Sequence, residues 1–169
     1  MKTVYLLRHA KAEPASDKQE DINRNLAERG REACSVIGSY MKEKDYLPSY
    51  VLCSPATRTR QTFDLVTQSM GIVPKHEFEK KIYASTTEGI IALLHHFDDS
   101  ITSAMVIGHN PVMHHLALTL AQPISTNLHA TLELKYPTGA LTVLQFPVDS
   151  WQAISYGAGE LVDFFTPSN

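Results

Sequence analysis

Three short apolar runs constrain the fold of this chain more than any other feature, because each is followed by polar residues and then by a segment with helical spacing. The runs are residues 4–7, 49–53 and 103–107. Apolar runs of roughly four to eight residues are typical of strands buried on both faces, as in a parallel sheet. Strands that alternate with helices predict an α/β fold of three layers, with a mostly parallel central sheet and helices on both faces. At 169 residues, we expect one domain over residues 1–169.

Two capping boxes predict where helices begin. Asn25 and Glu28 are three residues apart, so each side chain can bind a free backbone N–H of the other residue, and a helix is expected from Asn25. A second capping box at residues 85–88 predicts a helix over residues 86–97. That helix is expected to follow a short strand at residues 76–78.

Two further helix starts combine a capping residue with a proline. Ser54 precedes Pro55, and Asn110 precedes Pro111, each directly after an apolar run. Proline is favoured in the first helical turn, where its missing N–H has no partner to lose. We therefore expect both helices to begin at the ends of buried strands, the second continuing over residues 112–121.

The last third of the sequence changes its period. Residues 131–136, 139–146 and 151–156 have the pattern of extended segments and are separated by turn residues. We predict antiparallel edge strands in this part of the chain.

Composition excludes several classes of function. The net charge is −3, which argues against broad binding to nucleic acid. The chain has neither a stretch of about 20 apolar residues nor the pattern of a secretory signal, so a cytoplasmic protein without membrane contact is expected. Cys34 and Cys53 are expected to be reduced thiols, and Cys53 lies in an apparent strand core rather than in a nucleophile's setting. A monomer is expected.

Arginine and histidine side chains stand at the ends of the predicted strands. Arg8 and His9 follow the first run, Arg58 lies in the helical turn after Ser54, and His109 follows the third run. The carboxyl ends of parallel strands lie on one side of a sheet, so these four residues are expected to converge. A neutral His9 could act as a nucleophile toward phosphorus, while the arginines and His109 stabilise the phosphoryl oxygens. The alternative is a buried histidine and arginines paired with carboxylates, which four coincident strand ends disfavour.

The remaining histidines and cations are expected to be structural or surface residues. His114 and His115 are adjacent on a helix and face different directions, so we expect no metal site. Lys11 and Arg60 either extend the positive field of the pocket or are ordinary solvated charges. The other residues expected near helix ends or on the surface are His76, His95, His96 and His129.

Several segments, in order, resemble the histidine phosphatase superfamily, which includes the cofactor-dependent phosphoglycerate mutases, and within it the SixA-type phosphohistidine phosphatases. The matching segments are residues 7–11, 24–30, 53–62, 106–111 and 137–141. The resemblance implies that His9 becomes phosphorylated, that Arg8 and Arg58 bind phosphate, and that His109 is the second histidine of the pocket. It implies neither a metal nor an organic cofactor.

One departure from the family separates its branches. Mutases and many small-molecule phosphatases of the superfamily carry a glutamate-containing insertion after the third strand, and the corresponding residues 79–88 are few here. A minimal cap leaves the pocket open, which suits a phosphoryl group presented by another protein. We therefore expect a phosphohistidine phosphatase acting on a phosphotransfer protein. The alternatives are a small-molecule phosphomonoesterase or mutase, and a non-catalytic phosphoprotein-binding module.

The same departure leaves the proton donor without an assignment. Asp21 is the first candidate, because it lies in the loop that leaves the nucleophile strand, and Asp17 and Glu79 are the others. Asp21 could equally be a solvated carboxylate or a partner of Arg24. Asp21 and Asn110 are both placed among the residues that contact substrate.

Overall fold

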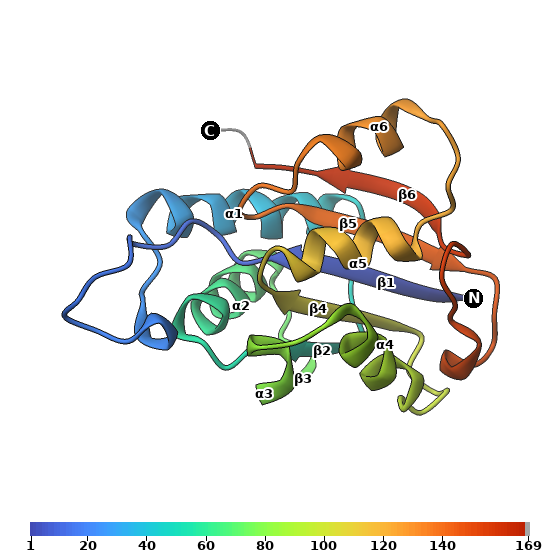
Figure 1. Ribbon diagram of the computed structural model, residues 1–169, viewed down its shortest axis with the longest axis horizontal. Coiled ribbons are helices and arrows are strands. Elements are labelled where there is room, and N and C mark those ends of the chain that lie inside the picture. Colours follow the sequence, from blue (N-terminus) through green and yellow to red (C-terminus); the bar gives the residue numbers. More distant parts are fainter. Residues whose placement is uncertain (168–169) are drawn as a thin grey trace.

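The computed structural model, which describes residues 1–167, has a six-stranded sheet at its centre (Figure 1). The strands lie in the order β3-β2-β4-β1-β5-β6. The first four of these strands are parallel, while β5 and β6 are antiparallel to their neighbours. The mostly parallel sheet and its antiparallel edge are thus confirmed. The strands are β1 (Lys2–Arg8), β2 (Tyr50–Cys53), β3 (Lys75–Phe78), β4 (Ser103–Gly108), β5 (Leu141–Phe146) and β6 (Glu160–Phe165).

Helices cover both faces of the sheet, as predicted (Figure 1). Successive side chains of β1 point to opposite faces, so Tyr5 and Leu7 pack against one helical layer and Val4 and Leu6 against the other. The first layer holds α1 (Glu28–Glu43) and α2 (Thr57–Met70). The second holds α3 (Lys80–Tyr83), α4 (Thr87–His95), α5 (Val112–Leu120) and α6 (Asn127–Leu134). Two 3₁₀ turns, η1 (Asp21–Asn23) and η2 (Trp151–Ala153), complete the elements.

The helix start predicted at Asn25 is wrong, because α1 begins at Glu28. The Asn25 side chain is used elsewhere: its Oδ1 accepts from Gln61 Nε2 at 2.9 Å. Gln61 Oε1 in turn accepts from the backbone N–H of Leu26 at 2.7 Å. These contacts hold residues 25–27 extended against α2, so the capping box does not form.

The helices after Ser54 and Asn110 begin later than the capping residue, at Thr57 and Val112. Arg58 is nevertheless in the first turn of α2, as predicted. In the second capping box the cap is Thr86, whose hydroxyl accepts from Gly89 N at 3.0 Å.

Two of the extended segments predicted near the C-terminus are wrong. Residues 131–136 are mostly helical, because Thr126 caps α6 through the N–H of His129 at 3.0 Å. Residues 151–156 begin with η2, which buries Trp151. The edge strand is β6 instead, which the sequence pattern did not reveal, and α3 was also not predicted.

The centre of the sheet is β1, which pairs with β4 on one side and β5 on the other. At its amino end Lys2 is 3% exposed, and its Nζ donates to the carbonyl oxygens of Asp99 and Ile101. At its carboxyl end the backbone of Arg8 is fixed by a turn: Gly139 N donates to the carbonyl oxygens of Arg8 (3.2 Å) and His9 (3.0 Å). Gly139 has a φ of 79°, which glycine adopts without strain.

Along residues 1–167, no helix combines the length and the apolar character that crossing a membrane requires.

Candidate active site

His9 directly follows β1 and is only 7% exposed. Its backbone N–H donates to the carbonyl oxygen of Gly108 at 3.1 Å, which continues the pairing of β1 with β4. Its ring nitrogen Nδ1 lies 2.7 Å from the carbonyl oxygen of Ala10. A carbonyl oxygen can only accept, so Nδ1 carries the proton and Nε2 keeps a free lone pair.

The surroundings of His9 keep the ring neutral. Burial is the main cause that lowers the pKa of His9 to about 3, and the proximity of His109 and the positive charges of Arg58 and Arg8 act in the same direction. The rings of His9 and His109 are 5.3 Å apart between centroids. The structure thus brings the four residues together, and a neutral His9 with a free lone pair could act as a nucleophile.

The loop after His9 is anchored to α2. The backbone N–H of Ala10 donates to Thr62 Oγ1 at 3.1 Å, and this hydroxyl donates to the carbonyl oxygen of Arg58 at 2.7 Å. Because Thr62 lies one turn after Arg58, a single helix fixes both the second arginine and the backbone beside the nucleophile.

Arg8 and Arg58 each have some of their donors bound by protein acceptors. Arg8 Nη1 donates to the carbonyl oxygen of Tyr136 at 2.9 Å. Arg58 Nη1 and Nη2 donate to the carbonyl oxygen (2.8 Å) and Oδ2 (3.0 Å) of Asp21. Burial lowers the pKa of Arg8 from its usual value. The nitrogen Nε of each arginine is buried and has no hydrogen-bond partner within residues 1–167.

His109, which follows β4, is held by Ser54 at the end of β2. Its Nε2 lies 2.8 Å from Ser54 Oγ, which already accepts from Ala56 N at 3.3 Å. A hydroxyl that accepts from Ala56 N keeps its own proton to donate, and with Ser54 as the donor to Nε2 the proton of the neutral ring lies on Nδ1. Burial lowers the pKa of His109 to about 4, so this histidine is a neutral hydrogen-bond donor.

Three buried N–H groups thus lack partners in the described part of the chain: Nε of Arg8, Nε of Arg58 and Nδ1 of His109. Buried polar groups are normally paired, because an unpaired donor costs about 1–3 kcal/mol. A transferring phosphoryl group carries three equatorial oxygens that need donors. Beside a neutral nucleophile, three such donors are suited to binding a phosphoryl group and stabilising its charge.

Asp21 lies at the rim of this site and is tied into it from three sides. Besides its bonds to Arg58, Oδ2 accepts from the Tyr83 hydroxyl at 2.7 Å, and Oδ1 accepts from Arg24 Nε at 3.0 Å. The hydrogen bond from Tyr83 and the neighbouring arginines hold the pKa of Asp21 down, at about 2. The expected pairing with Arg24 is present, and the ionised carboxylate is opposite to what a proton donor requires.

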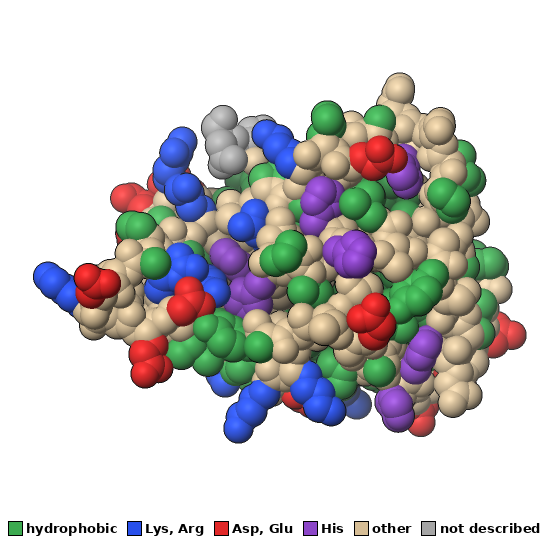
Figure 2. Space-filling view, viewed as in Figure 1, with side chains coloured by type: hydrophobic (Ala, Val, Ile, Leu, Met, Phe, Trp, Pro, Cys, Tyr) green, Lys and Arg blue, Asp and Glu red, His purple; other side chains and the backbone are tan. Residues whose placement is uncertain are grey.

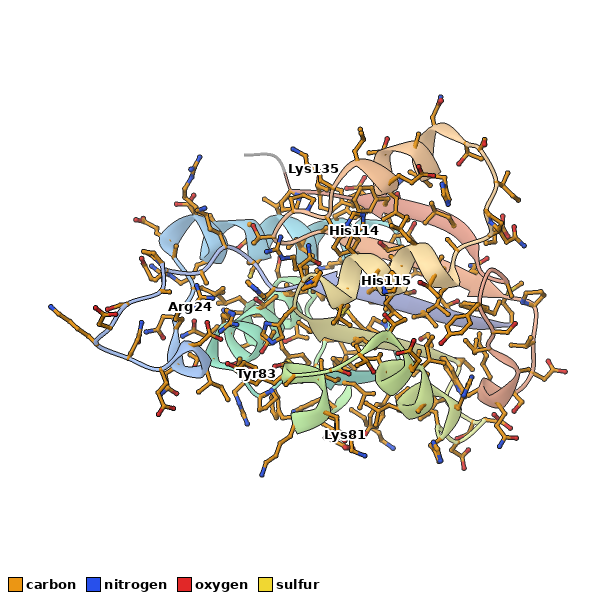
Figure 3. The ribbon with its side chains drawn as sticks, in the orientation of Figure 1. Arg24, Lys81, Tyr83, His114, His115 and Lys135 are labelled. Carbon is orange, nitrogen blue, oxygen red and sulfur yellow. The ribbon has the colours of Figure 1, made fainter. Side chains whose placement is uncertain are left out.

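Arg24 and Tyr83 are labelled in Figure 3, which shows the molecule from the same side as Figure 2. Arg24 comes from the loop before α1, and Tyr83 comes from α3 (Figure 3). The Tyr83 ring also meets the His109 ring edge to face, at 5.5 Å between centroids. In the space-filling view, histidine side chains gather near the middle of this face, beside lysines and arginines (Figure 2).

Asn110 is a positioning residue in this structure, since both ends of its amide have protein partners. Nδ2 donates to the carbonyl oxygen of Tyr136 at 2.9 Å, and Oδ1 accepts from His114 N at 3.2 Å. His114 and His115 face different directions, as expected: one ring contacts the carbonyl oxygen of Leu132 and the other the hydroxyl of Thr87. Within residues 1–167, no group of three or more His, Cys, Asp or Glu side chains could hold a metal ion.

The other candidates lie apart from the nucleophile. Asp17 and Lys11 are exposed, and Glu79 caps α3 through Lys81 N. Arg60 stacks on the Phe78 ring at 3.9 Å from its centroid, so it covers an aromatic side chain instead of extending the pocket. Cys53 is buried, and burial raises the pKa of its thiol, which agrees with a structural residue.

The remaining histidines have structural or surface settings as well. His95 and His96 contact the carbonyl oxygens of Ile154 and Ala92 at the end of α4. His76 is exposed, and His129 pairs with Glu133 on α6.

Sequence reasoning missed three residues that shape the site. The carbonyl oxygen of Tyr136 binds both Arg8 and Asn110, Ser54 orients His109, and Tyr83 binds Asp21. Tyr136 precedes the turn residues 137–139, which the sequence pattern did mark. Tyr83 lies in the short α3 and carried no signal in the sequence.

A family model described as histidine phosphatase superfamily (branch 1) matches residues 4–81. Curated relatives cover nearly the whole chain. An uncharacterized protein of Mycobacterium leprae, ML1117, is 30% identical over 95% of this chain and 99% of its own length. The uncharacterized protein Rv1276c of Mycobacterium tuberculosis is 29% identical over the same shares.

Solved structures agree with this match. A SixA protein from Agrobacterium tumefaciens, solved as a candidate phosphohistidine phosphatase, is 29% identical and has a TM-score of 0.82, covering 98% of both chains. A SixA protein of the same description from Nakamurella multipartita shares the fold at 24% identity, with a TM-score of 0.84 over 99% of this chain and 97% of its own.

Proposed function

The chain belongs to the histidine phosphatase superfamily, and from that premise we propose that it removes phosphate from phosphohistidine on a phosphotransfer protein, through a phosphorylated His9. The proposal treats residues 1–169 as one phosphatase domain. The observation that carries it is the neutral His9 with its free Nε2, beside three buried N–H donors that lack partners among the described residues.

The first chemical step is attack by His9. The lone pair of Nε2 forms a bond to phosphorus while the bond between phosphorus and the substrate nitrogen breaks. The electron pair of the broken bond stays on the departing imidazole. The hydrogen bond from Nδ1 to the carbonyl oxygen of Ala10 stabilises the positive charge that develops on the ring. Arg8, Arg58 and His109 donate to the phosphoryl oxygens as charge shifts onto them.

The second step returns the enzyme to its starting state. Water attacks the phosphorus of phosphorylated His9, the bond to Nε2 breaks, and inorganic phosphate leaves with the added hydroxyl group. Nε2 regains its lone pair, and the proton released by the water is shared between phosphate and solvent. The same three donors bind the phosphoryl group in both steps, so the site needs no rearrangement between them.

The open rim supports a protein substrate. Between β3 and α4 the chain has only residues 79–86, of which α3 takes up residues 80–83. These residues leave no segment long enough to enclose a small metabolite over His9. A phosphohistidine on another protein needs no such enclosure, because the partner surface itself covers the site.

Two variants test the proposal. We expect His9→Ala to lower kcat/KM on a phosphorylated histidine phosphotransfer domain by at least about 1,000-fold, because the nucleophile is lost. Wild-type protein, quenched during turnover, should carry phosphate on His9 that is labile in acid and stable in base. His96→Ala is the matched control, since His96 is exposed at the end of α4, and it should keep wild-type activity.

A panel of phosphomonoesters completes the test. Higher kcat/KM on sugar phosphates or phosphoglycerate than on the phosphorylated protein would favour a small-molecule phosphatase or mutase and reject the substrate assignment. Tight binding of the phosphorylated protein without turnover would favour a non-catalytic binding module.

A further inference from the structure

The rim carries an ionised carboxylate where a phosphatase acting on esters needs a proton donor. An alkoxide leaves well only if it receives a proton, so ester hydrolysis is served by a protonated acid at this place. Asp21 instead accepts from Arg24, Arg58 and Tyr83, and these contacts stabilise its charged form. An ionised Asp21 is suited to a leaving group that is stabilised by a nearby negative charge.

The geometry places Asp21 on the side from which the leaving group departs. His9 is 7% exposed, so its Nε2 attacks from the buried side of the phosphoryl group. In an in-line displacement the leaving group departs on the opposite side, toward solvent. The Asp21 side chain is 49% exposed and is bonded to Arg58, which contributes to the phosphate site. Asp21 and Tyr83 therefore flank the outward path.

The carboxylate has capacity for one more donor. Its two oxygens offer about four acceptor positions. Oδ2 accepts from Arg58 and Tyr83, whereas Oδ1 accepts only from Arg24 among the described residues. Oδ1 can thus accept a further N–H from a molecule at the rim.

A phosphorylated imidazole supplies that N–H. When its second ring nitrogen is protonated, the ring carries a positive charge and an N–H that points away from phosphorus. As the bond to phosphorus breaks, the electron pair neutralises the ring, and the proton stays on the second nitrogen. No proton has to be given to the leaving group, and none has to be taken by Asp21.

We propose that Asp21, held by Arg24 and Tyr83, is a specificity-determining residue that accepts the N–H of a departing imidazole and so selects phosphorus–nitrogen substrates over phosphate esters. This inference rests on the proposed function. An anionic leaving group such as p-nitrophenolate is repelled by the same carboxylate, since like charges at contact distance are unfavourable. Asp21 thereby discriminates in both directions.

The test compares Asp21→Asn with wild type on N-phosphoimidazole and on p-nitrophenyl phosphate. We expect kcat/KM for N-phosphoimidazole to fall by about 10-fold or more, because the variant amide lacks the charge that attracts the imidazolium. For p-nitrophenyl phosphate it should stay within about two-fold or rise, because the repulsion is removed. Glu20→Gln removes the same charge from the adjacent exposed residue and should change neither substrate's value.

A second readout separates selection from simple support of Arg58. If Asp21 only positions Arg58, both substrates should lose the same factor, and inhibition by inorganic phosphate should weaken equally; that result overturns the inference. An unchanged substrate ratio in Asp21→Asn overturns it as well. Tyr83→Phe should shift the ratio in the same direction by a smaller factor, because Asp21 loses one of the contacts that hold its carboxylate in position.

Failure of the proposed function has a different signature. If wild type does not dephosphorylate a phosphorylated phosphotransfer domain, the protein substrate is wrong. The preference for N-phosphoimidazole and its dependence on Asp21 can still be measured in that case, so the two results are independent.

Discussion

The two ends of strand β1 each carry a positively charged side chain, buried at Lys2 and partly buried at Arg8, and the contacts of the two side chains differ. Lys2 is 3% exposed, and its Nζ donates to two carbonyl oxygens, those of Asp99 and Ile101. Arg8 donates from Nη1 to the carbonyl oxygen of Tyr136, but its buried Nε has no partner within the described residues. The charged nitrogen of Lys2 is bound by protein acceptors, whereas the buried Nε of Arg8 remains available to a ligand.

The difference separates stability from function within a single strand. A buried cation whose charged nitrogen is bound by protein acceptors contributes to the folded state. A buried cation with a free donor costs stability in the free protein and regains it when an anion binds. The buried donor without a partner, more than burial or charge, is what supports the carboxyl end of β1 as part of the proposed phosphate site.

Arg8→Lys changes the cation at the carboxyl end of β1, and of the substitutions considered it has the largest expected effect. Lysine keeps the charge but lacks Nε–H and the planar donor arrangement, so we expect kcat/KM to fall by about 100-fold to 1,000-fold. The free energy of unfolding in urea should change by less than about 1 kcal/mol, because the lost Nε donor has no partner within the described residues. A loss of stability with unchanged kcat/KM would show that Arg8 is a structural residue.

Lys2→Met removes the cation at the amino end of β1. The side-chain length is kept, but two hydrogen bonds from a charged donor are lost, so the free energy of unfolding should fall by about 2 kcal/mol. Values of kcat/KM should stay within about two-fold of wild type, since the other end of the strand is unaltered. Loss of activity in the folded variant would contradict the prediction that Lys2 contributes to stability and not to activity.

The pH dependence of the free energy of unfolding also reports on the carboxyl end of β1, and it is the smallest of the expected effects. Burial lowers the pKa of His9 to about 3, against 6.5 in its ordinary state, so the unfolded chain binds more protons between these values. Stability therefore rises with pH across this window, and it falls as the pH is lowered from about 6.5 toward 4. We expect His9 to contribute about 1 kcal/mol per pH unit between pH 6 and 5.

Urea unfolding of wild type and His9→Gln at pH 7, 6 and 5 measures this contribution. The glutamine variant should lose stability less steeply than wild type as the pH falls. His109 acts in the same direction, because its pKa is lowered to about 4, and a residual slope is therefore expected in the variant. Equal slopes in the two proteins would contradict a neutral, buried His9.

The parallel half of the fold was predictable because three of its strands, β1, β2 and β4, are short, largely buried and followed by polar residues. Burial on both faces produces continuous apolar runs such as residues 103–107, and parallel strands then bring Arg8, Arg58 and His109 to one edge. What the sequence could not show is how each side chain is held. The contacts of Asp21 with Tyr83, and of Arg8 with the carbonyl oxygen of Tyr136, join residues far apart in the chain.

The C-terminal part was harder because local alternation and tertiary packing disagree there. Residues 131–136 alternate polar and apolar side chains like a strand, but the segment is mostly helical, with Leu132 buried and Leu134 82% exposed. In β6, Asp163 breaks the apolar pattern because it accepts hydrogen bonds from the hydroxyls of Tyr40 and Tyr46. Both deviations come from contacts with distant residues, which local sequence patterns do not contain.

The pairing of β1 also has a consequence for the order in which the protein becomes active during synthesis. Thr3 lies opposite Ser103, and Leu7 lies opposite Leu141, so both neighbours of this strand are made long after it. The carbonyl oxygens of Arg8 and His9 also wait for the N–H of Gly139. Contacts so distant along the chain form late, because a long loop must close first. His9 is therefore synthesised well before Gly139, and the backbone contacts that fix it form only after Gly139 has been made.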